Sequence, residues 1–242
     1  MRIDKLLSQL KYGSRKEIQK AIKDQSVIVD GKVIHQKDYN VDPINQTIEY
    51  NGEEVVYYKR VVLMLNKPSG VVSANYDLND KTVIDLIGPP YHRYDLKIAG
   101  RLDKDTEGLV ILTDDGDLLH QIISPKKNVY KTYEITTEKN IDNIHDLLKP
   151  MRIKDGRDRE YIPKRPIIES HQNNKAVIKI SEGKFHQVKR MFEAINHHVI
   201  HLKRTAINAL CLDVEIGEYR MLKEDEIKKL VSKENGYEIN ME

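Results

Sequence analysis

The sequence predicts an α+β fold in two domains, because helical and strand-type patterns both occur and are grouped along the chain. Apolar residues at helical spacing open the chain, whereas short apolar runs that end in turn residues recur from residue 27 onward. The length of 242 residues suits one or two domains and is ample for a buried core.

The N-terminal stretch predicts two helices followed by a β-hairpin. Leucine and isoleucine share one helical face over residues 2–11, and Ser14 with Glu17 forms a capping box that starts a second helix. Two short apolar runs, 27–29 and 32–34, flank an Asp-Gly turn. This pattern is typical of a small helical domain closed by a hairpin.

Positive charge is concentrated in the same stretch. Residues 1–37 contain nine Lys or Arg against four Asp or Glu, a net charge of +5, although the whole chain carries only +2. A charged helix face is usually only solvated, but it also suits phosphate neutralisation with little reading of bases. The candidate RNA-binding residues of this stretch are Arg2, Lys5, Arg15, Lys16, Lys20 and Lys23.

Further short strands are expected over residues 40–58, and we place a domain boundary near Tyr57 to Arg60. Next come an apolar strand at 61–65, an Asn-Lys-Pro-Ser-Gly turn, and a resumed strand at 71–73. Residues 75–97 are expected to form a loop beside the active site, with one short element at 83–87.

The stretch from Ala99 to Gly116, AGRLDKDTEGLVILTDDG, is the centre of the second domain. Its second half is a short apolar run that indicates a strand buried on both faces, and its first half is a charged loop between two glycines. The acidic residues of this loop partly match a calcium-binding pattern, but a β-type run follows where that pattern needs a helix. We therefore expect no metal site.

Helices and strands alternate along the rest of the chain. We expect a helix at 117–123 that is capped by the acidic turn before it, a basic loop at 124–127, strands at 131–135 and 176–180, a small helix at 141–149, a turn leading into a helix over 181–192, a helix at 223–232 and a flexible tail at 233–242. Four histidines, among them His186, have no partner residues at metal-ligand spacing, so we expect them to be ordinary packed or exposed side chains. The charged segment 154–165 has two equal interpretations: it lies along RNA, or it is a solvated insertion.

Four separated motifs together resemble the pseudouridine synthases that modify ribosomal RNA. They are NKPSG at 66–70, GRLDxxTxGL followed by DDG at 100–116, KTY at 131–133, and EGKFHQVKRMF at 182–192. Lys184 stands where many relatives have Arg, and His197-His198 replaces a usual Gly and polar residue. In the N-terminal stretch, RxDKxL, Ser14-Arg15 and VxVDG resemble the S-four type RNA-binding domain.

This resemblance implies an S-four type domain at 1–58 and a catalytic domain at 59–232 with a mixed, largely antiparallel sheet flanked by helices. It implies isomerisation of a uridine in ribosomal RNA, most closely of the small-subunit 16S type, after the base is flipped out of its stack. Asp103 would be the catalytic carboxylate, Lys189 its cationic partner, and Tyr133 the ring that stacks on the base. Arg101, Lys131 and Arg190 would contact RNA.

The reaction needs no redox change or group donor, so we expect no cofactor. One cysteine, no signal peptide and no apolar run near ~20 residues predict a cytoplasmic monomer without a membrane partner, acting on ribosomal RNA or a ribosome assembly intermediate. Three alternatives remain. They are a large-subunit pseudouridine synthase, a non-catalytic RNA-binding assembly protein, and a glycosidase-like hydrolase with a second carboxylate such as Asp105 or Asp114.

Overall fold

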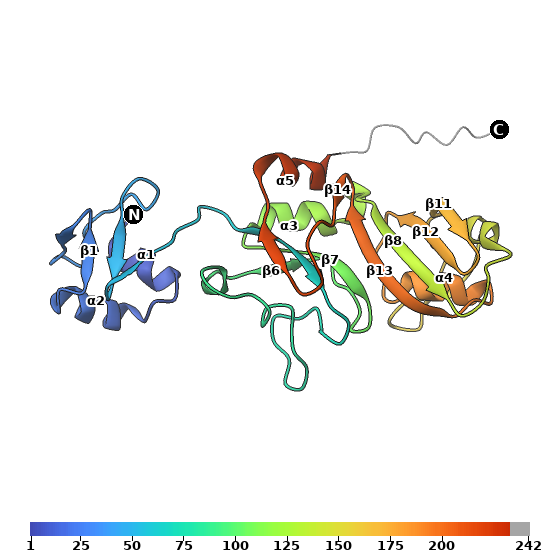
Figure 1. Ribbon diagram of the computed structural model, residues 1–242, viewed down its shortest axis with the longest axis horizontal. Coiled ribbons are helices and arrows are strands. Elements are labelled where there is room, and N and C mark those ends of the chain that lie inside the picture. Colours follow the sequence, from blue (N-terminus) through green and yellow to red (C-terminus); the bar gives the residue numbers. More distant parts are fainter. Residues whose placement is uncertain (233–242) are drawn as a thin grey trace. The chain divides into compact units, whose positions relative to one another are not determined.

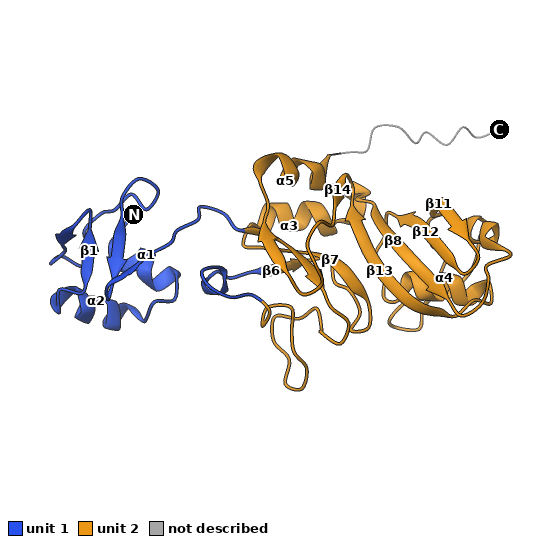
Figure 2. Cartoon of the chain, in the orientation of Figure 1, with its two compact units in different colours: residues 1–61, 87–96 blue, residues 62–86, 97–242 orange. Residues whose placement is uncertain are grey.

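The computed structural model describes residues 1–232, and its contacts divide the chain into two compact units (Figure 2). Unit 1 contains Met1–Val61 together with Ile87–Leu96, and unit 2 contains Val62–Leu86 and the chain from Lys97 onward. The flexible tail expected at 233–242 lies outside the described residues.

Unit 1 has the predicted helices and hairpin. Ser14 and Glu17 form the predicted capping box, with each side chain paired to the other's backbone N–H. The apolar faces of both helices pack on the sheet in one core. The elements are α1 (Ile3–Gln9), α2 (Arg15–Lys23) and a sheet of order β2-β1-β3-β4 formed by β1 (Val27–Val29), β2 (Lys32–Val33), β3 (Ile48–Tyr50) and β4 (Glu53–Glu54).

A segment from the middle of the chain completes unit 1. Residues 87–96 contain a single 3-10 turn, η1 (Tyr91–Arg93). The backbone N–H of Tyr58 donates to Tyr94 Oη at 2.6 Å, and the Tyr58 ring stacks on Tyr91 with centroids 5.4 Å apart. The Arg93 guanidinium lies 3.9 Å from the centre of the Tyr12 ring.

The preceding residues differ from the prediction. Neither the strand expected at 71–73 nor the element expected at 83–87 forms, and a single bridge between Val72 and Thr82 takes their place. Backbone hydrogen bonds on either side of Thr82 make this bridge, and Asp85 accepts hydrogen bonds from both the N–H and the hydroxyl of Thr82.

Unit 2 is built on one large sheet, whose strands extend from the centre to the right of Figure 1. Within residues 1–232 it has nine strands, and β7 with β13 is its one parallel pair. The sheet is therefore mixed and largely antiparallel, as predicted. Its main order is β11-β12-β8-β13-β7-β5-β15, from β11 (Ile167–Gln172), β12 (Lys175–Ile180), β8 (Lys131–Thr137), β13 (Val199–Ile207), β7 (Glu107–Thr113), β5 (Val62–Lys67) and β15 (Tyr219–Met221), with β6 (Lys97–Ala99) on β7 and β14 (Leu210–Cys211) on β13.

Helices cover part of this sheet. α3 (Gly116–Ile123) and α5 (Glu224–Val231) share a core with β5 and β7, and Asp115 caps α3 as predicted. α4 (Gln187–Ala194) contacts β13 and a small hairpin of β9 (Ile153–Lys154) and β10 (Glu160–Tyr161). The remaining turns are η2 (Pro125–Lys127) and η3 (Ile144–Leu148), so the small helix expected at 141–149 is a 3-10 helix.

Alternation along the strands separates two faces of the sheet. Lys67, Tyr133 and Arg204 are buried, while their strand neighbours Asn66, Glu134 and Lys203 line a groove. The side chains of these two sets therefore point to opposite faces.

Candidate catalytic site

The loop that carries Asp103 joins β6 to β7, and a buried arginine holds both of its ends. Arg204 is 2% exposed and comes from the middle of β13. Its Nη2 donates to the carbonyl of Gly100 at 2.8 Å, and its Nε donates to the carbonyl of Leu109 at 2.7 Å. One guanidinium thus fixes where the loop leaves and rejoins the sheet.

A buried lysine holds the middle of the same loop. Lys67 Nζ donates to the carbonyls of Thr106 at 2.7 Å, Lys104 at 3.2 Å and Pro68 at 2.9 Å. Burial lowers the Lys67 pKa to about 8, against the raising effect of the nearby carboxylates of Asp105 and others. Since this value is above neutral pH, Lys67 keeps the charge and the three protons that it donates.

Two close contacts complete the support. Ser73 Oγ donates to the Leu102 carbonyl at 2.8 Å and accepts from the Leu102 N–H at 3.0 Å. Gly108 lies so near the backbone of Arg204 that a Cβ would come within 2.2 Å of its carbonyl oxygen. The loop around Asp103 is therefore fixed by side chains far away in sequence.

The Asp103 carboxylate faces two basic side chains from the loop and helix after β12. Lys189 Nζ lies 3.9 Å from Asp103 Oδ2, and His186 Nε2 lies 3.5 Å from Asp103 Oδ1. Lys189 also donates to Asp105 Oδ1 at 2.6 Å, and this bond is the main cause of a lowered Asp105 pKa. The expected partner of Asp103 is thus shared, and its shorter contact is with Asp105.

Asp103 borders two adjoining hollows. An inner hollow of about 50 Å³ is lined by Asp103, Arg101, His186 and Tyr133, and Tyr133 as a residue is 7% exposed. An open cavity of about 500 Å³ shares the first three of these residues. Liquid water takes about 30 Å³ per molecule, so the inner hollow has room for little more than water, whereas the outer one is in the size range of ligand pockets.

The other candidate RNA-binding residues fall into two groups. Five basic side chains of α1 and α2 are exposed and pair with no other residue of 1–232: Lys5, Arg15, Lys16, Lys20 and Lys23. Arg2 instead donates twice to Asp4, and this hydrogen bonding lowers the Asp4 pKa. Arg2 therefore anchors the start of α1.

In unit 2, Arg101 is exposed, but Lys131 and Arg190 differ from the expectation of free phosphate contacts. Lys131 is only 9% exposed, because its strand is central in the sheet, and burial with the nearby Arg204 charge lowers its pKa to about 8. Arg190 donates to the Lys154 carbonyl and lies 5.2 Å from the centre of the Phe185 ring. Arg190 therefore links α4 to the β9–β10 hairpin.

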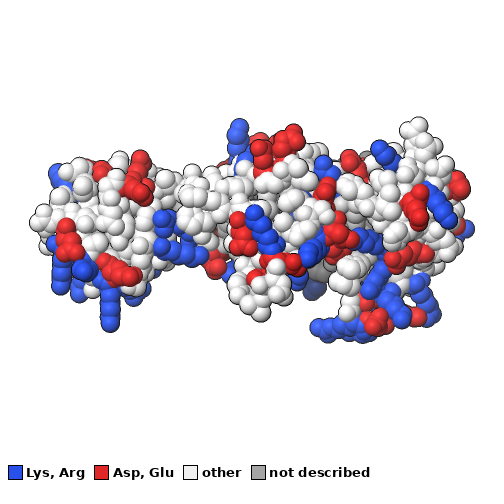
Figure 3. All heavy atoms as spheres, turned by 60° about the horizontal axis from the view of Figure 1, so that its bottom comes forward, with Lys and Arg blue, Asp and Glu red and all other residues white. Residues whose placement is uncertain are grey.

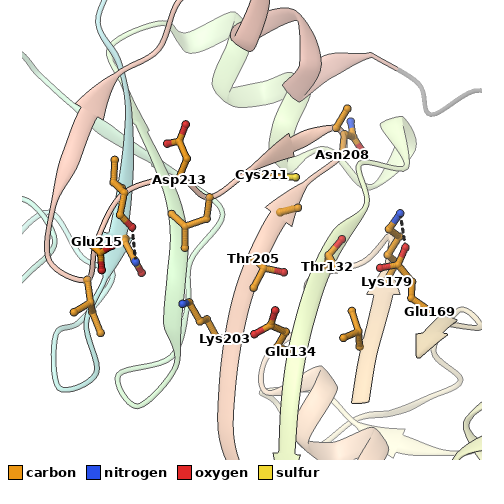
Figure 4. A pocket seen from close by; sticks show the side chains of 17 residues that line it. Thr132, Glu134, Glu169, Lys179, Lys203, Thr205, Asn208, Cys211, Asp213 and Glu215 are labelled. Carbon is orange, nitrogen blue, oxygen red and sulfur yellow. Dashed lines mark hydrogen bonds and ion pairs between the residues drawn. The ribbon is translucent and has the colours of Figure 1, made fainter. Parts of the chain in front are cut away.

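A larger groove, of about 1010 Å³, is lined by residues of the opposite sheet face (Figure 4). Thr132 and Glu134 line it, and they flank Tyr133 on β8. Alternation along the strand directs them away from Asp103. The larger cavity is therefore not the one that Asp103 borders.

The described residues contain no group of three His, Cys, Asp or Glu that could hold a metal ion. His197 bonds Asn143 at 2.7 Å and His201 bonds Glu107 at 3.1 Å, so the histidines have separate partners.

Sequence reasoning missed Lys67, Arg204, Ser73 and His186. Lys67 and His186 lie within motifs of the family resemblance, at 66–70 and 182–192, but no role was expected for either side chain. No strand was predicted over 199–207, where basic and apolar residues are mixed, so no sequence pattern indicated Arg204.

Comparisons with known proteins match nearly the whole chain. The family profile of RNA pseudouridylate synthases matches residues 61–194, and that of the S4 domain matches residues 1–46. An uncharacterised RNA pseudouridine synthase of Bacillus subtilis (strain 168) is 42% identical over 95% of this chain and 98% of its own length. Ribosomal small subunit pseudouridine synthase A of Escherichia coli (strain K12) is 35% identical over 96% of this chain and 100% of its own length. A crystal structure of a pseudouridylate synthase, 33% identical, covers 96% of this chain and 100% of its own with a TM-score of 0.65. No helix described over residues 1–232 is long and apolar enough to cross a membrane.

Proposed function

The chain belongs to the RNA pseudouridylate synthase family, and from this premise we propose that it isomerises a uridine of small-subunit ribosomal RNA with Asp103 as the catalytic carboxylate. One observation carries the assignment. Asp103 is on a loop fixed at both ends and in the middle, and it borders both hollows of the site. A preformed loop costs no reorganisation when charge develops during the reaction.

The reaction exchanges one bond for another within a single nucleotide. The N1–C1′ bond breaks, the base turns, a C5–C1′ bond forms, C5 loses a proton and N1 gains one. Asp103 supplies the negative charge beside the sugar and base, and Lys189 at 3.9 Å helps to hold that carboxylate in place. No group is donated from outside.

The target base has to leave its stack to reach Asp103, at a cost of a few kcal/mol. The Tyr133 ring lies at the inner hollow, where it stacks on the extruded base. Because this hollow is now only about 50 Å³, side chains around it move apart when the base enters. Arg101, exposed at both hollows, contacts the opened RNA.

Exposed Lys and Arg side chains bind the phosphates of the RNA backbone. In unit 1 the five exposed Lys and Arg of α1 and α2 neutralise phosphates, which supplies affinity without base reading.

In unit 2 the β9–β10 segment, residues 151–165, has six Lys or Arg against three Asp or Glu. Figure 3 shows Lys and Arg side chains, with some Asp and Glu among them, gathered at the lower right of the face that it draws.

The fastening of this hairpin favours RNA contact over a merely solvated insertion. Its Gly156 packs on Phe185, where a Cβ would come within 3.1 Å of that side chain. Lys184 lies 3.4 Å from the centre of the Tyr161 ring. Phe185 and Lys184 also line the outer cavity, so the hairpin is held next to the place where RNA enters.

The choice of subunit rests on a relative. The Escherichia coli protein whose name specifies the small ribosomal subunit matches this chain almost end to end. Pseudouridine maps of both ribosomal RNAs from a strain that lacks the gene test this choice, and a site missing only from the large-subunit RNA would contradict it.

The catalytic assignment is tested by Asp103→Asn, which removes the charge but keeps the shape. Release of tritium from C5 of labelled uridine in ribosomal RNA should fall below detection, while RNA affinity, which phosphate contacts dominate, should hardly change. Lys189 keeps Asp105 at 2.6 Å, so the variant should fold.

The exposed Asp117→Asn is the matched control and should keep full activity. Pseudouridine formation by Asp103→Asn would refute the assignment, and free uracil as the wild-type product would indicate a hydrolase instead.

A further inference from the structure

The proposed isomerisation leaves one requirement unassigned: a base must accept the proton from C5. After the C5–C1′ bond forms, C5 still carries its hydrogen, and the uracil ring regains its conjugation only when this proton leaves. A catalytic base must lie within hydrogen-bond reach of the atom that loses the proton and must accept it near the working pH.

His186 fits the geometric requirement. Its ring borders both the inner hollow and the open cavity, so it lies beside any base that enters between Tyr133 and Asp103. Nε2 is 3.5 Å from Asp103 Oδ1, and the side chain is 38% exposed, which leaves a path for the proton to solvent. An imidazole ring can accept a proton on one nitrogen and release it again to water.

The local structure holds this ring in an unusual position. His186 has φ +51°, a left-handed conformation that is unfavourable for a residue with a Cβ. Its ring stacks on Phe185 with centroids 3.7 Å apart and planes 18° apart. Phe185 packs in turn on Gly156 of the hairpin, so the imidazole orientation is set by a chain of contacts.

The other ionisable groups nearby already have tasks. Asp103 is the catalytic carboxylate of the proposed function, Asp105 is bound to Lys189 at 2.6 Å, and Lys189 is a cation with no free lone pair. Tyr133 holds the base with its ring. These carboxylates and Lys189 face His186, and Arg101 and Lys184 border the same two hollows. Because the cations have no free lone pair and both carboxylates have tasks, the imidazole is the group left to take up and release the proton.

We propose that His186 is the base that accepts the C5 proton and passes it to solvent, while N1 takes its proton from water. This assignment rests on the proposed function. It makes His186 a catalytic residue that acts after the step served by Asp103.

The test uses His186→Gly in the full-length protein. Glycine suits the left-handed backbone and leaves a hole the size of the lost ring. With small-subunit RNA or particles labelled with tritium at C5, label release should slow by about 10²- to 10⁴-fold, the range of general-base catalysis. Added imidazole should restore much of the loss, and substituted imidazoles should restore it in order of their basicity.

A second substrate separates the steps. RNA transcribed with 5-fluorouridine has no proton to lose at C5, so its conversion to a rearranged nucleoside reports only the earlier bond changes. His186→Gly should convert this RNA at the wild-type rate, whereas Asp103→Asn should not convert it at all. If wild-type protein acts on neither substrate, the proposed function fails rather than the role of His186.

His186→Gln separates a base from a positioning residue, because its amide can still donate to Asp103 but cannot take up a proton. His198→Gly, at an exposed histidine, controls for an added glycine and should release label normally. Normal label release by His186→Gln, or equal loss of both reactions in His186→Gly, would overturn the proposal.

Discussion

The side chains around Asp103 show why the carboxylate stays available for chemistry. Lys67 and Arg204 are buried cations that direct their donors at backbone carbonyls of the loop. A buried charge needs such hydrogen bonds to offset its lost hydration. Lys67 and Arg204 therefore fix the backbone of the loop and donate no hydrogen bond to the Asp103 carboxylate.

The role of Tyr133 can be separated into ring and hydroxyl. Tyr133→Phe keeps the ring, so label release should stay within a few-fold of wild type. Tyr133→Ala removes a stacking contact of about 1–3 kcal/mol per base and should lower kcat/KM correspondingly. If Phe loses as much activity as Ala, the hydroxyl takes part in the reaction and competes with His186 for the proton.

Lys131 predicts a pH dependence of stability. Its pKa falls from 10.5 in the unfolded chain to about 8 in the folded protein, since burial penalises the charged form. Between these values the unfolded chain binds more protons, so the free energy of unfolding rises with pH. Lys131→Met should remove this rise, of the order of 2–3 kcal/mol, and should be the more stable protein below pH 8.

Urea unfolding at a series of pH values from 7 to 10 measures this effect. Lys175→Met, at an exposed lysine, is the control and should follow the wild-type curve. Identical pH slopes for wild type and Lys131→Met would show that Lys131 is charged equally in both states.

At the scale of elements, the sequence predicted the features that depend on residues close together in the chain. It did not predict the contacts between residues that are far apart in the chain. The capping box of α2, the Asp115 cap of α3 and the buried strand β7 depend on neighbours within a few residues, and all are confirmed. The support of the Asp103 loop depends on Arg204, about a hundred residues away. Periodicity carries no information about such a pairing, because it exists only after β13 has joined β7.

The pairing of β7 with β13 brings Gly108 against Arg204 and leaves no room for a side chain at Gly108. A Cβ there would lie 2.2 Å from the carbonyl oxygen and 2.8 Å from the nitrogen of Arg204, at a φ of +106°. Backbone cannot move aside as a side chain can, so Gly108→Ala should destabilise the protein by about 3 kcal/mol or more and lower activity. Gly116→Ala, where no atom lies within 4 Å, should change stability by less than about 0.5 kcal/mol. Equal unfolding midpoints for the two variants would contradict the tight contact.

At the scale of the whole molecule, the sequence predicted two folded parts but not the return of the chain to the first one. Residues 87–96 have the composition of an ordinary loop, and their contacts with Tyr58 and Tyr12 are long-range. The chain passes between the units at Val61–Val62 and again on either side of residues 87–96, whereas the prediction placed a single boundary near Tyr57 to Arg60. Removing residues 1–58 would also strip the partners of this segment, so charge substitutions probe unit 1 more cleanly than truncation.

Substitution of the exposed cations of α2 tests this role of unit 1 without removing any of its folded parts. The variant with Arg15, Lys16, Lys20 and Lys23 all changed to Gln should bind ribosomal RNA more weakly at low salt. Each lost phosphate contact should flatten the plot of log K against log salt by about 0.7 to 0.9. At saturating RNA the rate of label release should be unchanged, because none of these residues borders Asp103. Gln at the exposed lysines 139, 175, 228 and 229 makes the same change in net charge elsewhere and should leave the salt slope near wild type. An unchanged slope in the α2 variant would mean that this helix does not bind phosphates, and that affinity comes from unit 2.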